Sequence, residues 1–186
     1  MNPVYNILLD SAPDTYNGYL IRTDYRIGIQ ITQALNDPEL SRIEQLQAAL
    51  YLLYGNGLPD YETAINGLQW FMNGDPATTG DSGNTASGEI DCFSFDFDAG
   101  RIYTGFRRAY GIELDKVSLH WFRFLSLLGD LGECAFSRVI DYRTADLSKM
   151  DKETRKQYQI MRRKFALPRR ESEEEKEFMR LLGEGG

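Results

Sequence analysis

The stretch LHWFRFLSLL, residues 119–128, decides the fold of this chain. One histidine, one arginine and one serine are the only polar residues in it. A helix that is apolar nearly all round must be enclosed by its neighbours, so the rest of the chain has to cover this stretch. We expect the helix to begin after Asp115, whose carboxylate can cap its first turn, and to end at Gly129.

The surrounding run, residues 91–143, holds both cysteines, the only histidine and a large share of the aromatic residues. Cys92 and Cys134 match no metal-ligand spacing, and we interpret them as reduced, apolar side chains rather than as a disulfide. His120 lies within the most apolar stretch of the chain. This position favours a packed histidine over a catalytic base.

Asp91, Asp96 and Asp98 form an acidic group just before a predicted helix that ends at Gly111. They lack the alternating pattern and the distal glutamate of a calcium-binding loop, so we do not expect a metal site. We interpret Asp96 or Asp98 as the N-cap of that helix. The sequence also contains no glycine-rich phosphate-binding loop, and we expect no cofactor.

Helical periodicity and end signals predict three helices before this run and two after it. Thr23 or Asp24 caps the first helix, Ser41 with Glu44 forms a capping box for the second, and Asp60 opens the third. The second helix is expected to place Ile43, Leu46, Leu50 and Leu53 on its apolar face, with Tyr51 and Tyr54 beside them. The inward positions expected for the third helix are Tyr61, Ala64, Ile65, Leu68, Phe71 and Met72.

Asn17-Gly18 lies between two tyrosines and predicts a β-hairpin, because a type I′ turn requires a positive φ at both central positions. We expect its strands over residues 13–16 and 19–22, and residues 6–9 offer a third short strand.

The predicted fold class is mainly α: a single-domain bundle of about seven helices with a small N-terminal hairpin and one flexible loop. Residues 1–186 divide into 1–22 (hairpin), 24–73 (first helical half), 74–90 (flexible loop), 91–143 (central core helices) and 144–186 (charged C-terminal helices). The loop holds no large apolar side chain over residues 74–88, so it cannot bury enough surface to become ordered. It is either a plain linker or an arm that orders on binding a partner.

The formal net charge of -7 over 186 residues argues against general nucleic-acid binding, which needs a basic face to neutralise phosphates. No apolar stretch reaches the ~18 residues of a membrane span, and the N-terminus lacks the features of a secretory signal. We therefore expect a cytosolic protein with neither a membrane nor a nucleic acid among its partners.

Residues 155–170, RKQYQIMRRKFALPRR, form the best candidate interaction surface. Tyr158, Met161 and Phe165 make an inner stripe, which leaves the basic residues on the outer face. This face is either solvated and paired with the following glutamate run, or a docking helix for a protein partner, including another copy of the acidic body. The candidate partner-binding residues are Arg155, Arg162, Arg163, Lys164, Phe165, Phe178 and Leu181.

Several segments together resemble the bacteriophage gene-product-fifteen family of tailed phages and prophages. They are Ile21–Arg26, the helix around Ala64-Ile65 that closes on Phe71, Phe97-Asp98-Ala99 with Ile102-Tyr103 and Phe106, Tyr110–Leu114, Leu119–Leu128, and Tyr142-Arg143. Trp121-Phe122 stands where a tryptophan pair is expected, and Ile112-Glu113-Leu114 where Ile-Asp-Leu is expected. Both differences keep the chemical character. The resemblance extends from the hairpin to the region of Leu167.

This resemblance implies a protein encoded near the tape-measure gene of long-tailed phages of Gram-positive hosts. The implied role is that of a tail assembly chaperone, which coats the tape-measure protein in the host cytoplasm until tail-tube subunits replace it. The family is not associated with catalysis, so no catalytic residues are carried over. Two other classes stay open: a structural tail or connector component retained in the virion, and an enzyme or small ligand-binding domain.

Overall fold

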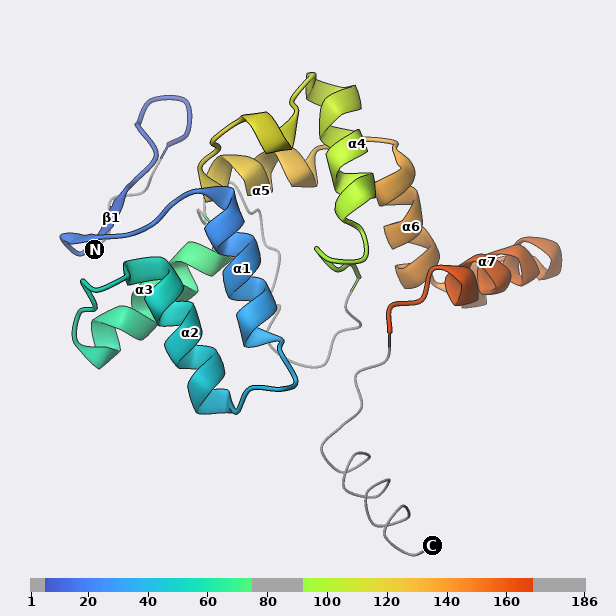
Figure 1. Cartoon of the computed structure of the whole chain (residues 1–186). Helices are drawn as coiled ribbons and strands as arrows, with labels where there is room; N and C mark the ends of the chain where they lie inside the picture. Colours follow the sequence, from blue (N-terminus) through green and yellow to red (C-terminus); the bar gives the residue numbers. More distant parts are fainter. Residues whose placement is uncertain (1–5, 75–91, 169–186) are drawn as a thin grey trace, which may run out of the picture.

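The computed structural model in Figure 1 describes residues 6–74 and 92–168. Within these residues lie seven α-helices, two short 3-10 helices and a two-stranded antiparallel hairpin. The elements are β1 (Thr15–Tyr16), β2 (Tyr19–Leu20), α1 (Tyr25–Leu35), α2 (Arg42–Tyr54), α3 (Tyr61–Asn73), α4 (Ala99–Tyr110), η1 (Leu114–Lys116), α5 (Trp121–Gly129), α6 (Ala135–Thr144), η2 (Leu147–Lys149) and α7 (Lys152–Lys164). The mainly helical fold class is confirmed. The loop predicted after residue 74 and the helix expected after residue 170 lie outside the described residues.

The hairpin forms where the sequence places it, but its strands are only two residues long. Asn17 and Gly18 have φ values of 48° and 84°, as a type I′ turn requires. The third strand expected at residues 6–9 is wrong. This segment is a turn, because the Leu9 N–H donates to the carbonyl of Asn6 at 2.9 Å.

Most helix ends form as their local signals indicate. The Ser41–Glu44 capping box is complete at the start of α2, and the side chains of Asp24 and Asp60 cap α1 and α3. Gly111 takes up a left-handed conformation (φ 68°) after α4, which supplies the bend that a residue with a side chain adopts only with strain.

The central helix α5 begins later than expected, at Trp121, and Asp115 is not its cap. Asp115 lies in the separate 3-10 helix η1. The backbone between the two helices pairs with the start of α1: the Tyr25 N–H donates to the carbonyl of Leu119 at 2.8 Å, and the Trp121 N–H donates to the carbonyl of Thr23 at 2.7 Å. Because this long-range pairing keeps residues 117–120 extended, the helix starts only after His120.

The aromatic side chains of α5 form the centre of the core, as the opening stretch predicts. Trp121, Phe122 and Phe124 are each at most 2% exposed. Phe71 from α3 stacks on Trp121, and Tyr25 from α1 stacks on Phe124. The neighbouring helices therefore enclose the most apolar stretch of the chain.

Two of the inward positions expected for α2 and α3 are wrong. Ile43 is 71% exposed and Tyr61 is 72% exposed. Ile43 lies in the first turn of α2, where Gln45 takes a buried position instead. Tyr61 is the first residue of α3 and lies at the edge of the helical pair. Helical spacing shows which residues share a face of a helix, but it does not show at which residue the end of the helix stops contacting the neighbouring helix.

The helices are arranged around α5, with α1, α2 and α3 beside the hairpin on one side and α4 and α6 on the other (Figure 1). α7 follows α6 and extends away from the body at the opposite end from the start of α3. Within the described residues, none of the helices combines the length and the apolar character needed to cross a membrane.

Candidate protein-interaction site

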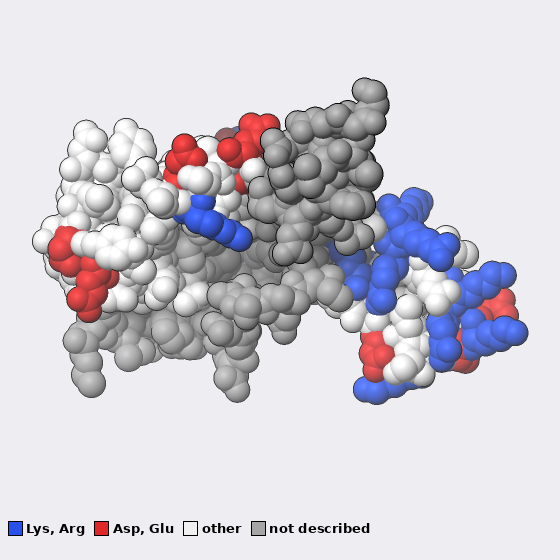
Figure 2. Space-filling model, turned by 90° about the horizontal axis from the view of Figure 1, so that it is seen from below, with Lys and Arg blue, Asp and Glu red and all other residues white. Residues whose placement is uncertain are grey.

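α7 is the most exposed helix of the described chain, and none of its residues is buried. It packs against α6 and η2 at one end of the molecule. Lysine and arginine side chains gather on this end in Figure 2, whereas acidic side chains mark the far end of the body. Residues 144–168 carry seven Lys or Arg and three Asp or Glu (net +4), and residues 6–74 carry three and eight (net -5).

The inner side of α7 is fixed to α6 by aromatic and polar contacts. The hydroxyl of Tyr158 donates to Asp141 Oδ2 at 2.7 Å, and this hydrogen bond raises the pKa of Tyr158. The ring of Tyr142 meets Tyr158 edge-on at 5.1 Å and stacks on Phe165 at 6.1 Å. The stripe Tyr158, Met161 and Phe165 therefore lies on the inner side, as its spacing predicts, and is half-buried.

Two of the candidate arginines reach back to the body of the protein. Arg155 donates to three carbonyls of the connection before α7, those of Leu147, Ser148 and Met150. Arg162 Nε donates to the carbonyl of Tyr142 at 3.0 Å, near the end of α6. These carbonyls lie at or next to helix ends, where backbone donors are few, and a guanidinium has enough donors to satisfy several of them. Both arginines therefore position α7.

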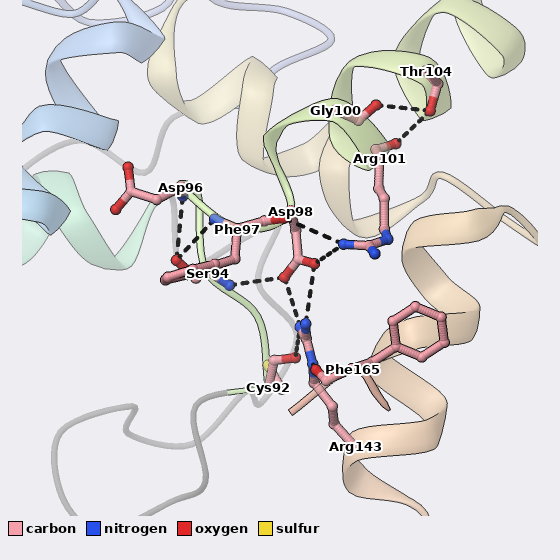
Figure 3. A network of polar contacts seen from close by, with 10 residues as sticks. All are labelled: Cys92, Ser94, Asp96, Phe97, Asp98, Gly100, Arg101, Thr104, Arg143 and Phe165. Atoms are coloured by element: carbon pink, nitrogen blue, oxygen red, sulfur yellow. Dashed lines mark hydrogen bonds and ion pairs between the residues drawn. The ribbon is translucent and has the colours of Figure 1, made fainter. Parts of the chain in front are cut away.

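Phe165, another candidate, ends α7 in a polar network centred on Arg143 (Figure 3). Arg143 Nε donates to the Phe165 carbonyl at 2.7 Å, and its Nη1 donates to the Cys92 carbonyl at 3.1 Å. The guanidinium of Arg101 lies 5.2 Å above the Phe165 ring. Phe165 is thus held by the protein's own core.

Asp98 completes this network and does not act as the N-cap expected for α4. It occupies the N-cap position, but its side chain accepts no capping hydrogen bond from the helix. Its carboxylate is fully buried and pairs with Arg143 at 2.6 Å and with Arg101 at 2.8 Å. Burial alone would raise the pKa of Asp98, but the hydrogen bonds from Arg143 and from the Ser94 N–H, with both guanidinium charges, hold it below its usual value.

The outer side of α7 carries a second, exposed line of side chains. Lys152, Lys156, Ile160 and Arg163 follow one another at spacings of four, four and three residues, which places them on one face of the helix. We call these four residues the basic stripe. Ile160 is 57% exposed in its middle. Within the described residues, the three charged members make no hydrogen bond or ion pair.

α2 also has an outward stripe, in which two of the three side chains are large and apolar. Ile43, Gln47 and Tyr51 repeat at four-residue spacing on its exposed side. Ile43 and Tyr51 are 71% and 58% exposed, whereas Gln45 is 7% exposed and donates to the Asp37 carbonyl at 2.7 Å. A polar residue therefore lies inside and two large apolar residues lie outside. We call Ile43, Gln47 and Tyr51 the α2 stripe.

A family model described as Bacteriophage Gp15 protein matches residues 10–167. The chain belongs to this phage protein family. The match includes every strand and helix of the described residues. No curated protein and no solved structure matches the chain.

The segments that carry the family resemblance build the scaffold of this Gp15-family protein. The first of them meets the central segments: the Tyr25 hydroxyl and Arg26 Nη2 each donate to the Leu114 carbonyl at 2.8 Å. A second contact joins Asp98 to Arg143, 45 residues away. These segments fix the positions of α1, α4, α5 and α6. α7 and α2 pack against this scaffold and lie at the surface of the protein.

The candidate residues from the sequence thus fall into three groups in this Gp15-family protein. Arg155, Arg162 and Phe165 anchor α7, whereas Arg163 and Lys164 are exposed. Phe178 and Leu181 lie outside the described residues. Lys152, Lys156, Ile160 and the outward position of the α2 stripe are not among the residues predicted from the sequence. The first three could have been found from their spacing, which places them opposite the inner stripe. The α2 stripe could have been found because α2 has more apolar residues than one face of the helix can hold.

No group of three or more His, Cys, Asp or Glu side chains suited to a metal ion occurs among residues 6–74 and 92–168. Asp96, one of the three acidic residues considered above, makes a hydrogen bond with Gln33 at 2.5 Å. Asp98 is in the Arg143 network, and Asp91 lies outside the described residues. Two surfaces of the described residues, the basic stripe and the α2 stripe, are therefore candidates for protein binding.

Proposed function

We propose that this Gp15-family protein is a non-enzymatic tail assembly chaperone that binds the tape-measure protein in the cytoplasm of its bacterial host. The observation that carries the proposal is the α2 stripe, which turns Ile43 and Tyr51 outward while Gln45 is buried. Exposing large apolar side chains to water costs free energy. A partner that covers them recovers about 25 cal/mol for each Å² of apolar surface removed from water.

Other exposed side chains near α2 support this proposal. Eight of the ten large hydrophobic residues that are exposed in the described chain lie between Leu8 and Tyr61. They belong to the N-terminal turn, the hairpin, α2 and the start of α3, which lie on one side of the molecule in Figure 1. Single exposed apolar residues are normal, but their concentration on this side of the molecule supports an interaction there.

A long amphipathic helix suits the α2 stripe as a binding partner. Such a helix presents apolar side chains at three- and four-residue spacing, which suits the four-residue spacing of Ile43, Gln47 and Tyr51. Many copies of a weak binder along one extended target hold it by multivalency, and each copy can still be displaced singly. These are the properties required of a coat that tail-tube subunits later replace.

Co-expression with the tape-measure protein of the same phage tests the proposal. We expect this protein to raise the soluble fraction of the tape-measure protein and to co-purify with it. The double variant Ile43→Ser and Tyr51→Ser should lower co-purification about tenfold or more, as expected when interface anchors of about 2 kcal/mol are lost. Phe97→Ser is the matched control, because Phe97 is 60% exposed but lies outside α2, and should leave binding unchanged.

Failure of the wild-type protein to co-purify with the tape-measure protein would contradict this function. Mass spectrometry of purified phage particles separates it from the structural alternative. A chaperone should be absent from mature particles or strongly depleted in them. Retention in stoichiometric amounts would instead identify a tail or connector component.

A further inference from the structure

We infer that copies of this protein associate head to tail, with the basic stripe of α7 on one copy binding the start of α3 on the next. The binding segment on the second copy is residues 58–62, which we call the acidic tip. This inference concerns contacts between identical chains and does not depend on the tape-measure protein.

The acidic tip matches the basic stripe in charge and in apolar character. Leu58 and Tyr61 are 53% and 72% exposed, and the exposed carboxylates of Asp60 and Glu62 lie beside them in the sequence. The basic stripe has the inverse composition, an exposed Ile160 among cations. Apolar contact at the centre with opposite charges around it is the usual composition of a specific interface.

The two surfaces lie at opposite ends of one molecule. In Figure 1 the connection from α2 to α3 is at one end and α7 is at the other, and Figure 2, turned by 90°, shows acidic and basic side chains at the same two ends. A copy therefore cannot satisfy its own basic stripe with its own acidic tip. Contact between different patches on two copies is heterologous, and repeating it produces a ring or a filament instead of a closed dimer.

The glutamate run after α7 is the competing occupant of the basic stripe. Residues 171–177, ESEEEKE, supply negative charge, and the apolar Phe178 and Leu181 follow them in the sequence. The acidic tip is favoured as the partner of Ile160 because Leu58 and Tyr61 lie within the same five residues as its two carboxylates. The distribution of charge points the same way, because the net -5 of residues 6–74 attracts the net +4 of residues 144–168 on another copy.

Analytical ultracentrifugation of the purified full-length protein tests the inference directly. We expect the average mass to rise with concentration beyond that of a dimer in about 0.05 M salt, and to fall towards the monomer in about 0.5 M salt, where the Debye length is short. Lys156→Glu should weaken association about tenfold or more, because it places like charges opposite each other. Arg108→Glu is the matched control: it makes the same change in net charge at an exposed position on α4 and should leave association unchanged.

A mixing experiment separates head-to-tail contact from any symmetric one. Lys156→Glu has a damaged basic stripe and an intact acidic tip, while Tyr61→Ser has the reverse. Each variant alone should remain monomeric, and an equimolar mixture should form one-to-one dimers that do not grow. Circular dichroism spectra should match the wild type, because both side chains are exposed.

Three results would overturn the inference. The first is a wild-type protein that remains monomeric in low salt at its highest soluble concentration, and the second is a mixture that remains monomeric. The third concerns the glutamate run: neutralising Glu173, Glu174 and Glu175 to glutamine should change association less than about threefold, since a screened, exposed charge pair is weak. A strengthening well beyond this would show that the run covers the basic stripe within its own chain.

Discussion

Arg143 and Asp98 form an ion pair in the interior of the protein, with 2.6 Å between Nη1 and Oδ2 and 3.1 Å between Nη2 and Oδ1. Their side chains are 6% and 0% exposed. Arg143 also donates to the carbonyls of Cys92 and Phe165, so the pair joins α4 and α6 to the end of α7. The position of the basic stripe on the outer side of α7 therefore depends on a buried charge pair.

Separating this pair should be strongly destabilising. Asp98→Ala should lower the free energy of unfolding by about 3–5 kcal/mol, because it leaves the charge of Arg143 buried and unpaired. Arg143→Ala should cost less, because Asp98 keeps its ion pair with Arg101. The double variant should cost clearly less than the sum, since no lone charge remains. Urea unfolding of the wild type, the two single variants and the double variant measures this coupling. Additive effects would contradict a direct interaction.

The same pair predicts a dependence of stability on acid pH. Burial would raise the pKa of Asp98, but its hydrogen bonds with Arg143 and Ser94 and the nearby guanidinium charges lower it. A carboxyl group whose pKa is lowered by folding stabilises the folded state fully above its unfolded pKa of about 4. This contribution is lost as the pH falls through the lowered pKa. Asp98→Asn should therefore show a shallower decrease in unfolding free energy than the wild type below about pH 4.

Urea unfolding between about pH 2 and pH 6 measures this difference. The dependence of the unfolding free energy on pH should become shallower only by the contribution of one carboxyl group. Other carboxyls, such as those of Asp24 and Asp151, also have lowered pKa values and keep their contributions. In Asp24 burial opposes the shift, and hydrogen bonds from Arg26 and Ser118 produce it. A variant with the full wild-type slope would show that Asp98 does not titrate in this range.

Alanine substitutions at two helical glycines, Gly28 and Gly100, should change the stability of the protein in opposite directions. A Cβ atom on Gly28 would lie 2.3 Å from the indole ring of Trp121, which is 2% exposed and has no room to move. Gly28→Ala should lower the free energy of unfolding by about 1–3 kcal/mol or more. Gly100 in α4 has no atom within 4 Å of such a Cβ, so Gly100→Ala should raise stability by up to about 1 kcal/mol. Thermal unfolding of both variants tests the pair, and equal effects would contradict it.

Trp121 itself should tolerate one substitution and not another. Trp121→Ala should cost about 3–5 kcal/mol, because it opens a cavity among Phe71, Phe95 and Phe124. Its indole Nε1 is buried without a hydrogen-bond partner in the part of the chain that the structure describes. Trp121→Phe removes this unsatisfied donor and keeps the aromatic contacts, so it should cost less than about 1.5 kcal/mol. Urea unfolding compares them, and similar losses would show that the indole nitrogen is bonded after all.

Local signals in the sequence were sufficient for most of the fold. The turn at Asn17-Gly18 and the capping box of Ser41 and Glu44 depend on residues within a few positions of one another. The predicted start of α5 failed because it is set by backbone bonds to Thr23 and Tyr25, almost a hundred residues earlier. Distant pairing of this kind leaves no periodic trace in a single sequence.

For the candidate site, too, local spacing predicts the structure and contacts between distant residues do not show in the sequence. The amphipathic spacing of α7 predicted which side of the helix faces the body. It did not predict that Arg155 and Arg162 turn back to carbonyls before α7 and at the end of α6, because those carbonyls are fixed by where α6 stops. The sequence favours Asp96 or Asp98 as a cap because nothing local shows that Arg143, 45 residues away, is the partner of Asp98. It favours an inward Ile43 because helical spacing alone cannot assign a face when apolar residues occur on both sides of a helix.

His120, the only histidine, is the N-cap of α5 and predicts a second pH dependence. Its Nδ1 accepts a hydrogen bond from the Phe122 N–H at 3.1 Å, so the proton of the neutral ring lies on Nε2, which donates to the Pro13 carbonyl at 3.0 Å. Protonating Nδ1 would break the cap. Burial lowers the pKa of His120, and so does the charge of Arg123, against opposing contributions from Pro13 and Asp14.

A histidine whose pKa is lowered by folding stabilises the folded state fully above its unfolded pKa of about 6.5. The contribution decreases as the pH falls from there towards the lower folded pKa, because the unfolded chain binds the proton more readily. We expect the free energy of unfolding, measured in urea between about pH 5 and pH 8, to decrease towards the acid end. His120→Asn should remove this slope, because asparagine also caps helices well but does not titrate. An unchanged slope in the asparagine variant would assign the effect to another group, and loss of stability at every pH would show that Pro13 needs the imidazole ring.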